Sequence, residues 1–175
     1  FDGVMHEAYQ DSYLPVLDLF EEYEQLRLAL HVSGPLMEWL DQHYGQYVDR
    51  LAGLVAEGRL EIVGGAFYEP ILTMLPSRDR KGQIQSYAHW LERNLGSRPA
   101  GMWTPERVWE ASLTSDVVVA GIRYTVVDDF HFRAAGLNDQ ELTGYLITED
   151  EGRLLNIFPG SEHLRYTIPF QPAAA

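Results

Sequence analysis

A glutamate between two tryptophans is the pattern in this sequence that most directly suggests chemistry. Glu106 lies between Trp103 and Trp109 and is followed at once by Arg107. Aromatic rings pack against the apolar C–H face of a pyranose, and a carboxylate can attack an oxocarbenium-like anomeric centre. Arg107 would hold Glu106 in the ionised form that a nucleophile needs. An Arg–Glu surface pair beside core tryptophans fits the same spacing equally well.

A second carboxylate, Glu69, follows a glycine pair and precedes a proline. Gly64 and Gly65 allow close backbone approach, and Pro70 biases Glu69 toward an extended conformation. Tyr68 adds an aromatic side chain beside it. Glu69 could bind substrate hydroxyls or brace its loop, and the residues alone slightly favour the bracing role.

Two aspartates and a histidine form a dense polar patch after a valine-rich run. Asp128, Asp129 and His131 could hold a divalent metal, bind sugar hydroxyls, or stabilise a turn through bonds to the backbone. Adjacent side chains on a strand point to opposite faces, so at most one aspartate faces the site if the strand continues. His31, in an apolar run, is more simply a hydrogen-bonded core residue.

Alternating hydrophobic patterns predict the elements that position these residues. Helical periodicity covers residues 4–23, 36–54, 84–95 and 112–120, and short apolar runs predict strands at 28–32, 60–63, 101–103 and 124–127. This order predicts a parallel sheet with covering helices. Ligands bind beyond the carboxyl ends of such strands, and three of the runs lead directly into the polar clusters described above.

The pattern changes after Gly136. Residues 145–148 and 154–158 flank a short polar segment and predict a β-hairpin, and residues 164–170 predict a further strand. We find no linker within the sequence and no second domain.

Charge and composition exclude several classes of function. A formal net charge of −13 opposes binding to a phosphate backbone, which argues against nucleic acid as a partner. The absence of cysteine excludes disulfides, thiolate metal sites and cysteine nucleophiles. No apolar run reaches the roughly 20 residues that span a bilayer, so we expect no membrane partner.

Four ordered motifs resemble the landmarks of glycoside hydrolase family 57, and the likeness is greatest to its 4-α-glucanotransferase and α-amylase-like members. The resemblance extends over nearly the whole chain. The motifs are His31-Val32-Ser33-Gly34-Pro35-Leu36, Leu60-Glu61-Ile62-Val63-Gly64-Gly65-Ala66-Phe67-Tyr68-Glu69-Pro70, Trp103-Thr104-Pro105-Glu106-Arg107-Val108-Trp109 and Val127-Asp128-Asp129-Phe130-His131-Phe132.

The resemblance implies an α/β fold, a fragment of a (β/α)7 barrel, and a retaining mechanism on α-1,4-glucans. By position Glu106 corresponds to the nucleophile, and Glu69 and Trp103 match residues of the substrate site. His131 and one of the two aspartates, for which we select Asp129, are further expected contacts. We add Arg107 and Tyr68 to this substrate-binding set. We expect no cofactor and no metal.

The motif order also departs from the family pattern. The His-rich first strand and the aspartate that serves as general acid/base are not found, so we expect residues 1–175 to be a partial catalytic barrel that is inactive by itself. We expect an α-glucan or maltooligosaccharide substrate, a cytoplasmic location, and a parent enzyme that could form a homo-oligomer. A metal-dependent carbohydrate deacetylase and a non-catalytic glucan-binding fragment stay open as alternatives.

Overall fold

The computed structural model describes residues 2–168 and residue 171. It begins with a helical segment made of three pieces, α1 (Asp2–Ala8), a π-helical turn (Tyr9–Tyr13) and α2 (Leu14–Glu22). The sequence predicted helix across this region, and the structure adds the π turn. Because Pro15 has no N–H and its ring crowds the preceding turn, a widened turn before it relieves the conflict. The N–H of Leu14 accordingly bonds to the carbonyl of Tyr9.

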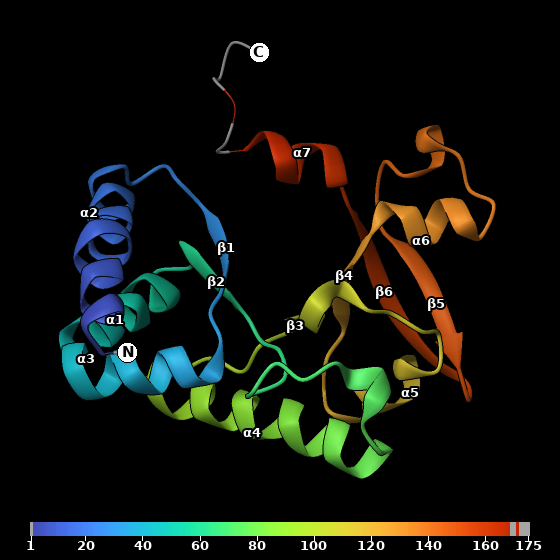
Figure 1. Cartoon of the computed structure of the whole chain (residues 1–175), viewed down its shortest axis with the longest axis horizontal. Helices are drawn as coiled ribbons and strands as arrows, with labels where there is room; N and C mark the ends of the chain where they lie inside the picture. The colour runs from blue at the N-terminus through green and yellow to red at the C-terminus, as the bar shows by residue number, and fades with distance from the viewer. Residues whose placement is uncertain (1, 169–170, 172–175) are drawn as a thin grey trace.

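Strands and helices then alternate through the rest of the chain (Figure 1). The regular elements, in chain order, are β1 (Leu28–His31), α3 (Gly34–Ala56), β2 (Leu60–Val63), α4 (Ser77–Leu95), β3 (Gly101–Trp103), α5 (Leu113–Val119), β4 (Tyr124–Asp128), α6 (Asp129–Ala134), β5 (Leu146–Asp150), β6 (Arg153–Gly160) and α7 (Glu162–Thr167). Short 3-10 turns cover Leu72–Met74, Pro105–Arg107 and Asp139–Glu141. The four predicted strands and the hairpin are confirmed to within a residue or two.

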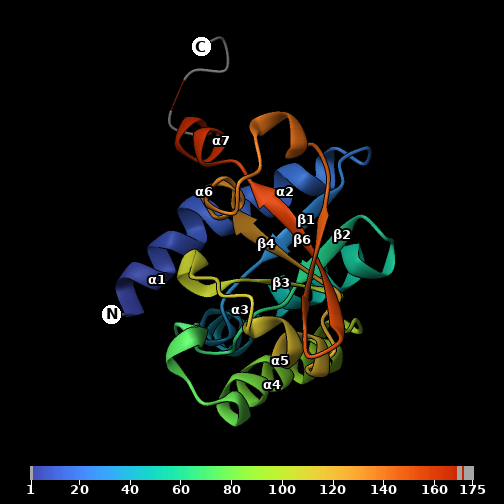
Figure 2. The same ribbon diagram turned by 90° about the vertical axis from the view of Figure 1, so that its right-hand side faces the viewer.

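The strands form two sheets that are joined edge to edge. Strands β1 and β2 are parallel, and β3, β4 and β6 form a second parallel set to which β5 adds an antiparallel edge. A parallel bridge between Gly64 and Met102 links β2 to β3, so the sheets follow one another as neighbours. Over the described residues the strands form an open, mostly parallel series and no closed barrel, with helices packed along it (Figures 1 and 2).

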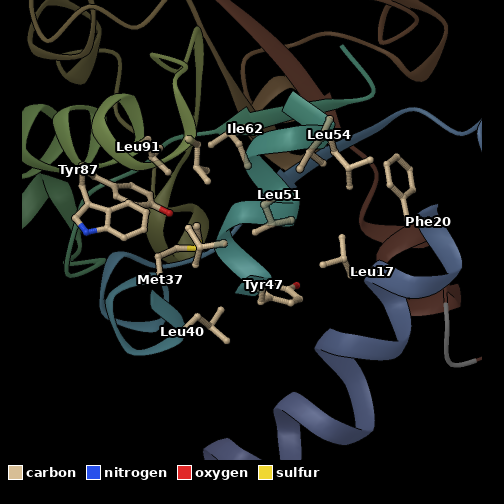
Figure 3. Packing of buried hydrophobic residues seen from close by; sticks show 14 of the residues in the cluster. Leu17, Phe20, Met37, Leu40, Tyr47, Leu51, Leu54, Ile62, Tyr87 and Leu91 are labelled. Carbon is tan, nitrogen blue, oxygen red and sulfur yellow. The ribbon is translucent and has the colours of Figure 1, made fainter. Parts of the chain in front are cut away.

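A large hydrophobic core fixes β1 and β2 against three helices. The apolar stripe of α3 includes Leu40, Tyr47 and Leu51, which are buried. Figure 3 shows them between Leu17 and Phe20 of α2 on one side and residues of α4 on the other. Burying a leucine-sized side chain contributes roughly 1.5–3 kcal/mol, so this stripe anchors the first half of the chain.

A second cluster holds the other strands. Met102, Val127, Leu155 and Ile157 alternate along β3, β4 and β6 and pack with buried residues of α5 such as Val117. Because side chains alternate along a strand, the residues between them face the opposite side of the sheet. Asp128, which follows Val127, and Trp103, which follows Met102, lie on that opposite side.

The predicted strand at residues 164–170 is wrong in its described part. Residues 162–167 form α7 instead, and Ser161 caps it by accepting a hydrogen bond from the N–H of Leu164. A serine cap satisfies a backbone donor at the helix start, and that signal was overlooked in favour of the apolar residues. Residues 169 and 170 lie outside the described part of the chain. No helix among the described residues has the length and apolar character to cross a membrane.

Candidate active site

The carboxyl ends of the parallel strands β1, β3 and β4 place three of the singled-out residues at the same end of the strands. His31, Trp103 and Asp128 are the last residues of these strands. The rings of His31 and Trp103 stack with centroids 6.1 Å apart and an interplanar angle of 26°. These contacts join segments about seventy residues apart in the chain, as the strand-end rule predicted.

Glu106 lies in a tight turn directly after β3. Its side chain is exposed, and both Glu106 and Arg107 have positive φ, at 50° and 54°. A left-handed conformation costs a non-glycine residue roughly 1–2 kcal/mol, so the surroundings must hold the turn. The N–H of Arg107 bonds to the carbonyl of Thr104 at 2.9 Å, and the buried hydroxyl of Thr104 lies 2.8 Å from that of Thr125 on β4. These hydrogen bonds hold the backbone of the turn, and the side chain of Glu106 extends from it into solvent.

Arg107 forms its ion pair with Asp128. Its Nη1 lies 2.9 Å from Oδ2 and 3.2 Å from Oδ1 of the aspartate, and both side chains are largely shielded from solvent. His131 adds a bond from Nε2 to the carbonyl of Arg107 at 3.3 Å. The sequence hypothesis paired Arg107 with Glu106; the structure instead uses Arg107 to tie the Glu106 turn to the end of β4.

Glu69 lies in the loop after β2, and its carboxylate contacts His31. Oε1 of Glu69 is 2.5 Å from Nε2 of His31, while Nδ1 of His31 is 3.1 Å from the carbonyl of Val63. Glu69 has a φ of 51°, so the extended conformation predicted from Pro70 is wrong. The N–H of Glu69 instead bonds back to the carbonyl of Ala66 in a turn, and this turn outweighs the local bias.

The glycine pair leaves room for these contacts. A Cβ on Gly65 would lie 2.8 Å from Cε1 of His31, and one on Gly64 would lie 2.8 Å from Cγ of Pro99. The sequence predicted that another group would approach the backbone closely at these glycines, and the structure shows that the groups are the His31 ring and the Pro99 side chain. Tyr68, next to Glu69, projects into solvent and is 67% exposed.

His31 begins the first of the four motifs, but sequence reasoning gave it no role in the site. It was interpreted as a core histidine, yet it contacts Glu69 and Trp103 at the strand ends. Its position as the last residue of a strand was the available signal. Behind it, Tyr87 of α4 donates to the carbonyl of Val32, and burial raises the pKa of this tyrosine, so its hydroxyl stays protonated as a donor.

Asp129 has surroundings different from those of Asp128. Its Oδ2 accepts from Arg133 at 3.1 Å and from the N–H of Glu162 at 3.4 Å, and its buried Oδ1 has no hydrogen-bond partner among the described residues. Asp129 lines a cavity of about 610 Å³ between α6 and α7. The two aspartates thus separate, and it is Asp128 that joins the Glu106 turn.

The polar patch does not assemble into a metal centre within the described residues. No group of three or more His, Cys, Asp or Glu side chains there converges on one point. Asp128 and Asp129 are each paired with an arginine, and Nε2 of His131 faces a carbonyl oxygen. Asp128, Asp129 and His131, which motivated the deacetylase alternative, therefore contact protein groups in this structure.

A cavity of about 420 Å³ opens beside the Glu69 contact. His31, Glu69 and Trp103 line one end of it, and apolar side chains of α2, β1 and α3 line the rest. Glu69 and Trp103 thus place a carboxylate and an aromatic ring at one end of this cavity, which can bind sugar hydroxyls and pack on a pyranose face.

Comparison with known proteins gives a consistent result. The sequence model of glycosyl hydrolase family 57 matches residues 3–174. A 4-alpha-glucanotransferase of Thermococcus kodakarensis is 45% identical over 172 residues, and an alpha-amylase of Pyrococcus abyssi is 44% identical over the same length. Each match covers 98% of this chain and 26% of the relative, so the chain spans about a quarter of the length of these relatives.

A solved structure agrees with the fold. The crystal structure of the 4-alpha-glucanotransferase from Thermococcus litoralis superposes with a TM-score of 0.94 at 44% identity, covering 98% of this chain and 27% of that one.

Proposed function

The chain belongs to glycosyl hydrolase family 57, and we propose that it supplies the nucleophile half of a retaining enzyme that acts on α-1,4-glucans, of the 4-α-glucanotransferase or α-amylase type. The observation that carries this proposal is the Glu106 turn. It presents an exposed carboxylate at the end of a parallel strand, beside Trp103, in a chain 44–45% identical to proteins with those two names. The substrate would be an α-glucan or a maltooligosaccharide.

In the proposed reaction Glu106 attacks the anomeric carbon. The C1–O bond to the leaving sugar breaks as the C1–Oε bond to Glu106 forms, and a second carboxylic acid gives its proton to the leaving oxygen. Water or the hydroxyl of another glucan then attacks C1 and gives its proton to the second group, while the C1–Oε bond breaks and releases the Glu106 carboxylate. We expect the second carboxyl group, which retaining enzymes place about 5 Å from the nucleophile, from a segment outside the described residues, because the motif that carries it in the family is not found here.

The neighbouring residues have supporting roles in this proposal. Trp103 packs on a sugar ring, and the Arg107–Asp128 pair braces the turn so that Glu106 need not reorganise during attack. Glu69 accepts a substrate hydroxyl. Tyr68, His131 and Asp129 are proposed as outer substrate contacts.

Product analysis of maltoheptaose tests the proposal. The full-length protein that carries this sequence is incubated with the heptaose beside its Glu106→Gln variant, with Glu110→Gln as a matched control because Glu110 is an exposed glutamate four residues further on. Longer and shorter glucans together, absent in the Glu106 variant alone, indicate a glucanotransferase. Shorter products alone indicate an amylase-type hydrolase.

Two other outcomes would contradict the proposal. Turnover that survives Glu106→Gln removes Glu106 as nucleophile, and an unchanged heptaose that still binds the protein favours a non-catalytic glucan-binding role. A cytoplasmic location and a homo-oligomeric parent enzyme stay predictions, to be checked by cell fractionation and by light scattering.

A further inference from the structure

We propose that His31 is a positioning residue that fixes the carboxylate of Glu69, so that its second oxygen is held ready to accept a sugar hydroxyl. This inference rests on the proposed function and deepens it, because it assigns a role to His31, which the proposed reaction leaves without one. The contact joins the end of β1 to the loop after β2 at 2.5 Å. The side chain of His31 is 17% exposed and that of Glu69 is 36% exposed, so the histidine is the more buried of the two.

The hydrogen-bond inventory explains why the contact is strong. The carbonyl oxygen of Val63 can only accept, so Nδ1 of His31 carries a hydrogen in their 3.1 Å contact. A neutral imidazole has no second hydrogen for Nε2. The 2.5 Å contact between Nε2 of His31 and Oε1 of Glu69 therefore needs a hydrogen that the two side chains share, which holds them together as a pair.

The imidazole ring is enclosed on several sides. Trp103 stacks on it, Tyr87 meets it edge-on with centroids 6.4 Å apart, and the missing side chain of Gly65 provides the space for Cε1. A ring confined in this way cannot follow a moving carboxylate. The histidine therefore sets the position of Glu69, and Glu69 does not set the position of the histidine.

Glu69 needs such an anchor because its backbone is unusual. At a φ of 51° the residue is in a conformation that few side chains favour. One oxygen, Oε1, is engaged by His31, whereas Oε2 makes no hydrogen bond to any described residue. Glu69 and Trp103 both line the 420 Å³ cavity beside this contact. With Oε1 held by His31, Oε2 is the acceptor left for a sugar hydroxyl in this cavity.

Two substitutions of His31 separate its two hydrogen bonds. The amide nitrogen of glutamine replaces Nε2, so His31→Gln keeps a donor to Glu69. The amide nitrogen of asparagine replaces Nδ1, so His31→Asn keeps the donor to Val63 and loses Glu69. His89→Asn is the matched control, because His89 is an exposed residue of α4.

Steady-state kinetics with maltoheptaose gives the first readout in the full-length protein that carries this sequence. We expect His31→Asn to raise KM about tenfold and to change kcat less than about twofold, with His31→Gln and His89→Asn near the parent. Adding Glu69→Gln to His31→Asn should raise KM no further than either change alone, because both remove the same hydroxyl contact. Equal effects of the two His31 variants, or full additivity with Glu69→Gln, would overturn the proposal.

A second readout does not depend on glucan activity. With 15N-labelled histidine, the ring nitrogen signals of His31, assigned by their loss in His31→Asn, should move on Glu69→Gln while those of His89 stay. If the protein converts no glucan, the proposed function fails, and this measurement still decides the contact. Unmoved His31 signals would refute the positioning role.

Discussion

Replacing Gly65 with alanine probes the packing on which the His31–Glu69 contact depends. A Cβ there would lie 2.8 Å from Cε1 of His31, well inside ordinary van der Waals contact. Gly65 is not among the residues with positive φ, so alanine is free of backbone strain and its effect is steric. The ring can restore contact only by moving away from Gly65. It is confined by Trp103, and any such movement stretches its bonds to Glu69 and Val63.

The expected magnitude follows from these contacts. If the ring stays in place, the overpacking costs about 1–3 kcal/mol. If the ring moves away, its hydrogen bond to Glu69 is lost, which costs about 1–3 kcal/mol. We expect the free energy of unfolding to fall by about 1–3 kcal/mol, with Tm lower by about 2–4 °C for each kcal/mol. Urea unfolding followed by circular dichroism measures the change.

A second glycine supplies the control. Gly82 lies within α4 and a Cβ there has nothing within 4 Å, so Gly82→Ala should raise the free energy of unfolding by about 0.5–1 kcal/mol. Opposite signs for the two variants support the close approach at Gly65. If Gly65→Ala is as stable as Gly82→Ala, the histidine ring does not lie where the structure puts it, and the argument for His31 loses its basis.

Burial raises the pKa of Tyr47 to about 12, above the unfolded value of about 10. The protonated tyrosine therefore contributes fully to the free energy of unfolding below pH 10, and this contribution falls by about 2–3 kcal/mol as the pH rises to 12. We expect no such fall in Tyr47→Phe. Urea unfolding at several pH values in this window checks this, and an equally steep decline in the variant would assign the effect to another group. Asp128→Asn should lower the free energy of unfolding by about 1–3 kcal/mol, because it leaves the shielded Arg107 without its counter-charge, whereas Asp139→Asn removes an exposed pair with Arg133 and should cost about 0–1 kcal/mol. Similar losses in both variants, measured by urea unfolding, would mean that shielding of the Arg107 pair has no energetic consequence.

Local sequence patterns predicted most of the elements. The apolar stripe of α3 predicted a helix, and Gly96, with a φ of 70°, predicted the end of α4. Both features depend on interactions between residues that are close in the sequence. The same is true of the β5–β6 hairpin. Where two local signals competed, the prediction failed: a serine cap makes residues 162–167 helical despite their apolar pattern. The helix predicted at the start of the chain is confirmed, with a π turn before Pro15 that the periodicity did not show.

The candidate site shows a different limit. Sequence singled out Glu106, Glu69 and Trp103 and predicted that strand ends would gather them, and His31 and Trp103 do stack there. It could not give the partner of Arg107, which is Asp128, twenty-one residues along the chain. Nor could it show that His31 contacts Glu69.

The sequence by itself determined the family, the order of strands and helices, and the residue types available for chemistry, because these depend on local periodicity and on ordered motifs. Only the tertiary structure decided which charges pair and which backbone conformations are strained. Arg107 could have met Glu106 or Asp128, and the parallel register of β3 beside β4 selects Asp128. Likewise β1 beside β2, with space left by Gly65, places His31 against Glu69. Pairings between distant segments follow from strand register and packing, which no short stretch of sequence contains.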